Sequence, residues 1–135
     1  MKTVMISGYF DPFHYAHLEY IKKASKLGDN LVCVVSDDKQ ARMKKGKANE
    51  PADKRAEIID LILMGLGVQH TVYVNTIDET TYVAKVLRQI FPDIFCRGSD
   101  KAIEDMPPDE REACEELDIE IVHLDGVQAH GSDFV

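Results

Sequence analysis

The sequence has few cysteines, no long apolar run and no visible leader. Its three cysteines, Cys33, Cys96 and Cys114, show neither C-x-x-C spacing nor close pairing. We expect buried free thiols in a reducing, cytoplasmic setting. The most apolar segment, residues 58–68, contains Asp60 and two glycines and is too short to span a bilayer. The amino end leads directly into a predicted strand, so we expect no signal peptide.

Positive charge is also scarce. The chain has 16 Lys and Arg residues against 24 Asp and Glu, a net charge of -8. This argues against nucleic-acid binding, which needs a broad basic face, but not against a small anionic ligand. We see no repeat, low-complexity tract or linker. A chain of 135 residues that is 44% hydrophobic is typical of one ordered domain, here residues 1–135.

Strand and helix patterns alternate along the chain. Strands are predicted at residues 2–7, 30–36, 71–75, 93–97 and 119–124. Helices are predicted at 17–27, 53–64, 80–91 and 107–117, and a polar loop, with or without a helical turn, at 37–51. Gly28 suits a left-handed cap for the first helix, and Ile58, Leu61 and Ile62 form the apolar face of the second. The alternation predicts one parallel five-stranded sheet with helices on both faces and the first strand central.

Two histidines stand at the first strand-to-helix corner, in Gly8-Tyr9-Phe10-Asp11-Pro12-Phe13-His14-Tyr15-Ala16-His17. Residues three apart share a helix face, and the N–H groups and dipole of a helix start attract anions. His14 and His17 therefore suit a phosphate cradle. Two alternatives are a pair of capping or surface histidines and a metal site formed with Asp11, although no third histidine has zinc-ligand spacing.

Further polar segments follow the other predicted strands, at residues 37–47, 97–101 and 125–132. The carboxyl ends of parallel strands lie at one edge of a sheet, where ligands bind at the topological switch. The convergence of these segments with the histidine corner predicts an active site there.

The histidine corner resembles the Gly-x-Phe-Asp and His-x-Gly-His signature of the cytidylyltransferase-like nucleotidylyltransferase superfamily, with Ala16 in place of the glycine. The basic residues 44–47, Lys54-Arg55 and the stretch 92–100 resemble further family segments. His130-Gly131-Ser132-Asp133 stands where the family has Ser-Thr-Thr. The sequence is similar to glycerol-3-phosphate and ethanolamine-phosphate cytidylyltransferases and to the adenylyltransferase part of ADP-heptose synthesis.

This resemblance implies a Rossmann-like enzyme that transfers CMP or AMP from a nucleoside triphosphate to a small phosphorylated alcohol or sugar and releases pyrophosphate. His14, His17 and Lys44 would be catalytic, and Lys45 and Lys47 would bind the acceptor. The nucleotide-binding residues would be Tyr9, Phe10, Asp11, Arg55, Arg97, Gly98, Asp100 and Ser132. Mg²⁺ would come with the triphosphate, and a homodimer is expected. The choice between CTP and ATP stays open, as does the acceptor.

Each assignment has a structural alternative. The basic run is also typical of a solvated face, and residues 97–100 or Ser132 of simple turns. Asp11 would either orient backbone N–H groups or help to hold Mg²⁺. Arg55 opens a helix, where a cation opposes the dipole, so we expect it to face an anion. For the whole protein, a non-catalytic nucleotide-binding or regulatory domain and a metal-dependent hydrolase are the other hypotheses.

Overall fold

The computed structural model describes residues 1–80, 82–98 and 106–124. The strands are β1 (Thr3–Gly8), β2 (Asn30–Ser36), β3 (His70–Asn75), β4 (Ile94–Gly98) and β5 (Glu120–Leu124). The helices are α1 (Tyr15–Ser25), α2 (Asp38–Lys45), α3 (Ala52–Leu66), α4 (Ala84–Ile90) and α5 (Pro108–Leu117). Asp100 and Ser132, both predicted site residues, lie outside the described residues.

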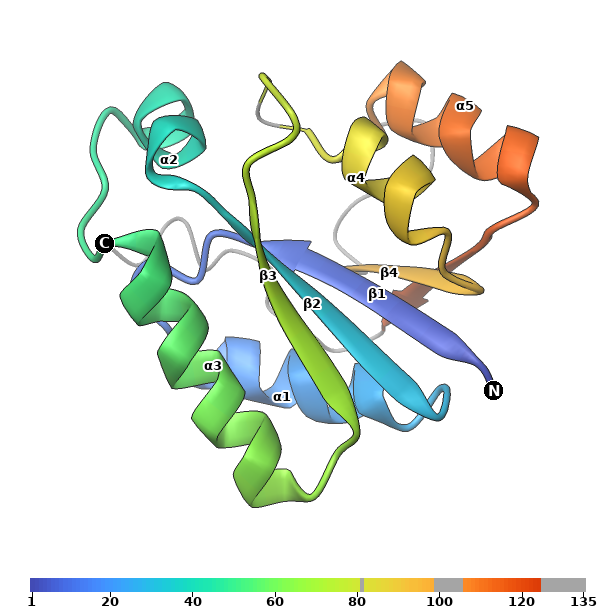
Figure 1. Ribbon diagram of the computed structural model, residues 1–135, viewed down its shortest axis with the longest axis horizontal. Helices are drawn as coiled ribbons and strands as arrows, with labels where there is room; N and C mark the ends of the chain where they lie inside the picture. The colour runs from blue at the N-terminus through green and yellow to red at the C-terminus, as the bar shows by residue number, and fades with distance from the viewer. Residues whose placement is uncertain (81, 99–105, 125–135) are drawn as a thin grey trace.

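The five strands form one sheet in which every pairing is parallel, in the order β3-β2-β1-β4-β5. The predicted central position of the first strand is confirmed. The strand order reverses between β1 and β4, because the chain builds outward to β3 and then returns to the other side of β1 (Figure 1).

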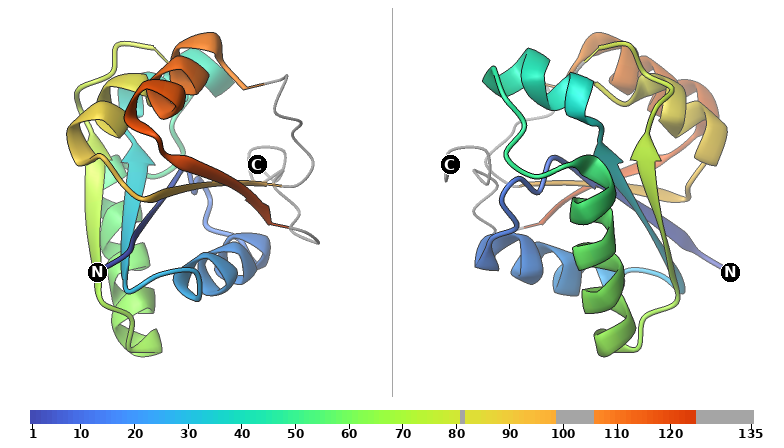
Figure 2. Two further views of the ribbon diagram at one scale, coloured as in Figure 1. Left: turned by 90° about the vertical axis from the view of Figure 1, so that its right-hand side faces the viewer. Right: turned by 60° about the vertical axis from the view of Figure 1, so that its left-hand side comes forward.

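Helices cover both faces of the sheet, as predicted (Figures 1 and 2). Alternate residues of β1 divide between two cores, because side chains along a strand point to opposite faces. Val4 and Ile6 pack with α1 and α3, whereas Met5 packs with α4 and α5. The helix α2 lies apart from these layers, at the carboxyl edge of the sheet.

The apolar face predicted for α3 is wrong. Ile58 and Leu61 are 42% and 59% exposed, and the helix buries Ile59 and Leu63 instead. Both pairs of residues have the spacing of one helix face, so the period alone does not say which face is buried. The packing of α3 against β2 and β3 determines it.

The prediction of a loop over residues 37–51 missed α2, which has eight residues. Asp37 and Gln40 form a reciprocal capping box, and Gly46 ends the helix in the left-handed conformation with a φ of 84°. The sequence signal of this helix is an Asp followed three residues later by a Gln, with a glycine after the basic run.

Gly28 does not serve as a left-handed cap. The helix α1 ends at Ser25 with Lys26 as a right-handed cap, and the φ of Gly28 lies outside the left-handed region. Glycine is required because a Cβ would stand 2.7 Å from the Lys2 carbonyl oxygen and 2.8 Å from Cγ2 of Val4. That carbonyl accepts the backbone N–H groups of the next two residues, so the turn lies tightly against the start of β1.

Candidate functional site

The site is built where β1 and β4 diverge at the carboxyl edge. In open parallel sheets this reversal of strand order leaves a crevice between neighbouring loops. The described segments at this edge are residues 9–14 after β1, the α2 region after β2, the loop after β3 and the end of β4.

The histidine corner begins with a close packing of Phe10 on Gly8. A Cβ at Gly8 would lie 3.0 Å from two ring atoms of Phe10. Phe10 is buried, has a positive φ of 52°, and its ring packs against Phe13 and His17. A left-handed conformation is costly for an aromatic residue, and here the buried ring holds the turn in it.

The two histidines are locked by the start of α1. His14 is the N-cap residue, and His17 is the third residue of the helix. The His17 Nδ1 accepts the His14 backbone N–H at 2.9 Å, and the His14 Nδ1 accepts the Ala16 N–H at 3.4 Å. Since each Nδ1 is an acceptor, each neutral imidazole carries its proton on Nε2. Capping and catalysis, which were alternative roles for these histidines, are therefore compatible, because the capping contacts place the donating proton of each ring on Nε2.

Asp11 ties the corner to the loop before α3. Its carboxylate is 1% exposed and accepts the backbone N–H groups of Asn49 at 2.7 Å and Glu50 at 2.8 Å. Of the two roles predicted for Asp11, the contacts match the orientation of backbone, although the loop concerned lies 38 residues away in sequence.

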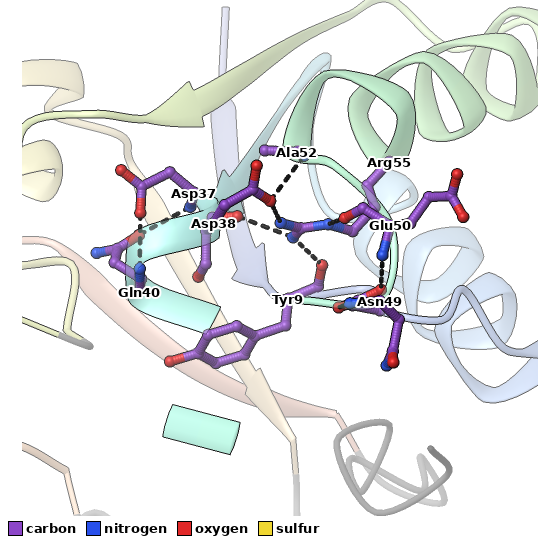
Figure 3. Close-up of polar contacts among 10 residues, drawn as sticks. Tyr9, Asp37, Asp38, Gln40, Asn49, Glu50, Ala52 and Arg55 are labelled. Carbon is purple, nitrogen blue, oxygen red and sulfur yellow. Dashed lines mark hydrogen bonds and ion pairs between the residues drawn. The ribbon is translucent and has the colours of Figure 1, made fainter. Parts of the chain in front are cut away.

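Arg55 is 1% exposed. Its guanidinium lies among Tyr9, Asp38 and Glu50 (Figure 3). Its guanidinium donates to the carbonyl oxygens of Tyr9, Ser36 and Glu50 and to the Asp38 carboxylate. The expected anion is thus present as Asp38, at 2.9 Å. Direct contact of Arg55 with a nucleotide stays a prediction.

The basic residues lie at the end of α2 and just after it. Arg42, Lys44 and Lys47 are exposed, as a role in binding phosphate requires. The first turn of α2 is fixed to the loop after β3, because Nε2 of Gln40 donates to the Thr80 carbonyl at 2.7 Å.

At the far side of the switch, Arg97 and His123 are register partners at the ends of β4 and β5. The Nε2 atom of His123 is buried and has no hydrogen-bond partner among the described residues. The sequence did not point to His123, because a histidine within an apolar strand gives no sign that its ring nitrogen will lack a hydrogen-bond partner among these residues after folding. Gly98 ends β4 beside it.

Glu110 of α5 is a buried carboxylate close to Arg97. It accepts the Val83 backbone N–H at 2.9 Å at the start of α4. Burial raises the pKa of Glu110, and this N–H and the Arg97 charge oppose the rise.

No group of three or more His, Cys, Asp or Glu side chains suited to a metal ion occurs within the described part of the chain. In the same residues, no helix is both long and apolar enough to cross a membrane.

Comparison with known proteins decides the family. Residues 5–129 match the Cytidylyltransferase-like family. The chain belongs to this family. It is therefore a nucleotidyltransferase, as its histidine corner led us to expect.

Several curated relatives of this nucleotidyltransferase are similar in sequence. It is 34% identical over 119 residues to an FAD synthase of Thermococcus onnurineus, covering 87% of this chain and 69% of that protein. It is 33% identical to an FAD synthase of Thermococcus kodakarensis, covering 73% of this chain and 62% of the relative. The bifunctional protein HldE of Shewanella sediminis is 30% identical, and the match covers 78% of this chain but only 21% of HldE.

Solved structures of the same fold include a lipopolysaccharide core biosynthesis protein from Thermoplasma volcanium. It has a TM-score of 0.70 and 27% identity, and the match covers 92% of this chain and 96% of that one. An Archaeoglobus fulgidus protein of unknown function shares the fold, with a TM-score of 0.64, 22% identity and 93% and 90% coverage. The predicted Rossmann-like nucleotidyltransferase fold is confirmed.

Proposed function

We propose that this nucleotidyltransferase transfers AMP from ATP to a small phosphorylated acceptor and releases pyrophosphate. The observation that carries the proposal is the pair of Nε2-protonated imidazoles at the start of α1, at the carboxyl end of the central strand. Two relatives named FAD synthase support ATP over CTP, since FAD is FMN joined to AMP. FMN therefore joins the alcohol and sugar phosphates as a candidate acceptor.

In the proposed reaction, an acceptor phosphate oxygen attacks the α-phosphorus of ATP in line, and the bond to the pyrophosphate oxygen breaks. Catalysis of such a step depends on positioning and on neutralising charge, so no protein nucleophile is required. The Nε2–H groups of His14 and His17 donate to phosphate oxygens as negative charge develops. Lys44 approaches the same oxygens from α2, and Lys45 and Lys47 bind the acceptor phosphate.

Tyr9 and Phe10 supply backbone N–H groups to the triphosphate, and the end of β4 borders the nucleoside. We place the purine beside His123, because a ligand atom there would give its buried Nε2 the missing partner. Arg97 and Gly98, and the undescribed Asp100 and Ser132, complete the proposed nucleotide contacts.

Mg²⁺ enters this proposal as part of the substrate. Each Asp11 oxygen accepts a backbone N–H group, the residue is 1% exposed, and no group of three or more metal-ligating side chains occurs among the described residues, so these contacts favour a structural role of Asp11 over a resident magnesium site. Magnesium commonly binds through phosphates with few protein ligands, which agrees with delivery as the ATP complex.

One domain over residues 1–135, a cytoplasmic location and a homodimer complete the proposal.

The test measures pyrophosphate release with ATP or CTP and a panel of acceptors: FMN, glycerol 3-phosphate, ethanolamine phosphate and a heptose phosphate. His14→Asn and His17→Gln keep residue types that cap a helix start but remove the imidazole donors. We expect ATP-dependent, acceptor-dependent release, and a fall in kcat of about a hundredfold or more in each variant.

His70→Asn is the matched control. His70 lies at the opposite edge, at the start of β3, where it contacts Asp60 and the Val68 carbonyl. This variant should keep the wild-type kcat. Release with CTP only, no release with any pair, or full activity in His14→Asn would each contradict the proposal.

A further inference from the structure

One buried guanidinium joins four segments around the site (Figure 3). The Arg55 Nη1 donates to the Tyr9 carbonyl at 2.6 Å and to the Ser36 carbonyl at 2.8 Å. Its Nε donates to the Glu50 carbonyl at 2.8 Å, and its Nη2 to Asp38 at 2.9 Å. These acceptors belong to the histidine corner, the end of β2, the loop before α3 and the start of α2.

Asp11 complements Arg55 at the same loop. Its two oxygens take the N–H groups of Asn49 and Glu50, while Arg55 takes the Glu50 carbonyl. The backbone of residues 49–50 is therefore held from both sides by buried charged groups. Asp38 links the start of α2 to the start of α3, because its Oδ1 also accepts the Ala52 N–H at 3.0 Å.

The network fixes the basic segment at both of its ends. Arg55 holds the start of α2 through Asp38, and Asp11 and Arg55 hold residues 49–50 just beyond Lys47. Lys44 and Lys47 lie between these anchors and are exposed. Their distance from the histidine corner thus depends on the buried side chains of Arg55 and Asp11 and on the partly exposed carboxylate of Asp38.

The same guanidinium orients a peptide of the corner. The peptide bond between Tyr9 and Phe10 is trans, since the cis bond of this turn is the one between Asp11 and Pro12. In a trans peptide the carbonyl and the following N–H point in opposite directions. Since the Tyr9 carbonyl points to Arg55, the Phe10 N–H points away from it. Anchoring the carbonyl therefore sets the direction of a proposed phosphate donor.

We propose that Arg55, together with Asp11, is a positioning residue of this nucleotidyltransferase rather than a nucleotide ligand. It aligns the lysines of α2 and the Phe10 N–H with the two histidines. Both Nη1 hydrogens are committed to carbonyls, so a phosphate would have to displace a buried bond to reach that nitrogen. This inference rests on the proposed function.

The experiment compares wild type with Arg55→Lys and Asp38→Asn. Lysine keeps the positive charge but has a single nitrogen, which does not reach four acceptors in different directions. Hydrogen exchange read by mass spectrometry follows residues 42–50. Calorimetry gives the ATP dissociation constant, and pyrophosphate release gives kcat. Arg88→Lys is the control, because Arg88 pairs with Glu116 on the exposed α4–α5 surface.

A positioning role predicts that exchange over residues 42–50 rises at least tenfold in Arg55→Lys. The kcat should fall about a hundredfold, since small displacements of catalytic groups have effects of that order. ATP affinity should change by less than about fivefold, because the phosphate ligands themselves remain. Asp38→Asn, which keeps the Oδ1 acceptor but removes the negative charge paired with Arg55, should shift exchange and kcat in the same direction, and it replaces Arg55→Lys if that variant does not fold.

Unchanged exchange with a weaker ATP affinity would overturn the inference and make Arg55 a direct ligand. Faster exchange with an unchanged kcat would overturn it as well. A wild-type protein without pyrophosphate release marks failure of the proposed function instead, whereas an active wild type with normal variants marks failure of this inference alone.

Discussion

Single residues at this site hold the backbone and, in the proposed reaction, also serve the chemistry. The ring nitrogens of His14 and His17 that accept N–H groups of α1 also determine which nitrogen donates. Two glycines also act at this scale, because they lack a Cβ atom. Gly8 leaves room for the Phe10 ring, and Gly28 lets the turn before β2 lie against Lys2.

Replacing Gly28 with alanine should destabilise the protein by about 1–3 kcal/mol, the range for overpacked sites. The added Cβ meets a backbone carbonyl at 2.7 Å, and backbone does not move aside as a side-chain end does. Denaturant unfolding measures the change. Gly65→Ala is the control with the opposite sign, since nothing lies within 4 Å of its added Cβ and alanine favours the helix by about 1 kcal/mol. Equal stability of the two variants would contradict this account.

At the scale of elements, the start of α4 is satisfied by side chains that lie outside this helix. Asp78 accepts the N–H groups of Lys85 and Val86 in the first turn of α4, and Glu110 of α5 accepts that of Val83. These acceptors explain why α4 begins at Ala84 rather than at the predicted residue 80. They also fasten α4 and α5 together above one face of the sheet.

The buried Glu110 should make stability depend on pH. Because burial raises its pKa in the folded protein, its contribution is fully present below the unfolded pKa and is lost as pH rises through the folded value. Glu110→Gln mimics the protonated form, so it should exceed wild type in unfolding free energy at pH 7 and match it below pH ~4. Urea unfolding across this range tests the difference.

Glu110→Ala is the control for the hydrogen bond. It leaves the Val83 N–H without its acceptor and should be about 1–3 kcal/mol less stable than Glu110→Gln at every pH, because neither variant titrates at this position. A constant gap between wild type and Glu110→Gln from pH 3 to pH 7 would refute the predicted titration.

At the scale of the whole molecule, the histidine corner follows β1, whereas Arg97 and His123 lie on the other side of the switch point, at the ends of β4 and β5. The nucleotide is proposed to span both sides, with phosphates at α1 and purine near β5. A ligand that binds only the folded state raises its apparent stability, so thermal shift reports on this geometry.

Replacing His123 with leucine should separate folding from binding. Without ligand, the variant should gain about 1 kcal/mol, because a buried nitrogen with no partner among the described residues is removed. The stabilisation by ATP and Mg²⁺ should decrease. CTP, GTP and UTP serve as comparison ligands in the same melts. An undiminished ATP shift in the variant would place the purine elsewhere.

Much of the fold was predictable because its signals are local. Continuous apolar runs such as residues 30–36 predict buried parallel strands, and the apolar face of Val83, Val86 and Leu87 predicts a helix that is buried on that side. The α2 helix was missed although its signal is also local, because the polar composition hid the capping pair Asp37 and Gln40.

The sequence by itself determined the alternation of strands and helices, the central first strand and the histidine corner, since each follows from period, caps and a contiguous motif. Only the tertiary structure decided how Arg55 and Asp11 are used. Apart from the Asp38 carboxylate, the partners described for them are backbone groups of residues 9, 36, 49 and 50, and backbone atoms are the same in every residue type. No pattern of letters encodes such contacts, because they arise only when distant loops meet at one edge of the sheet.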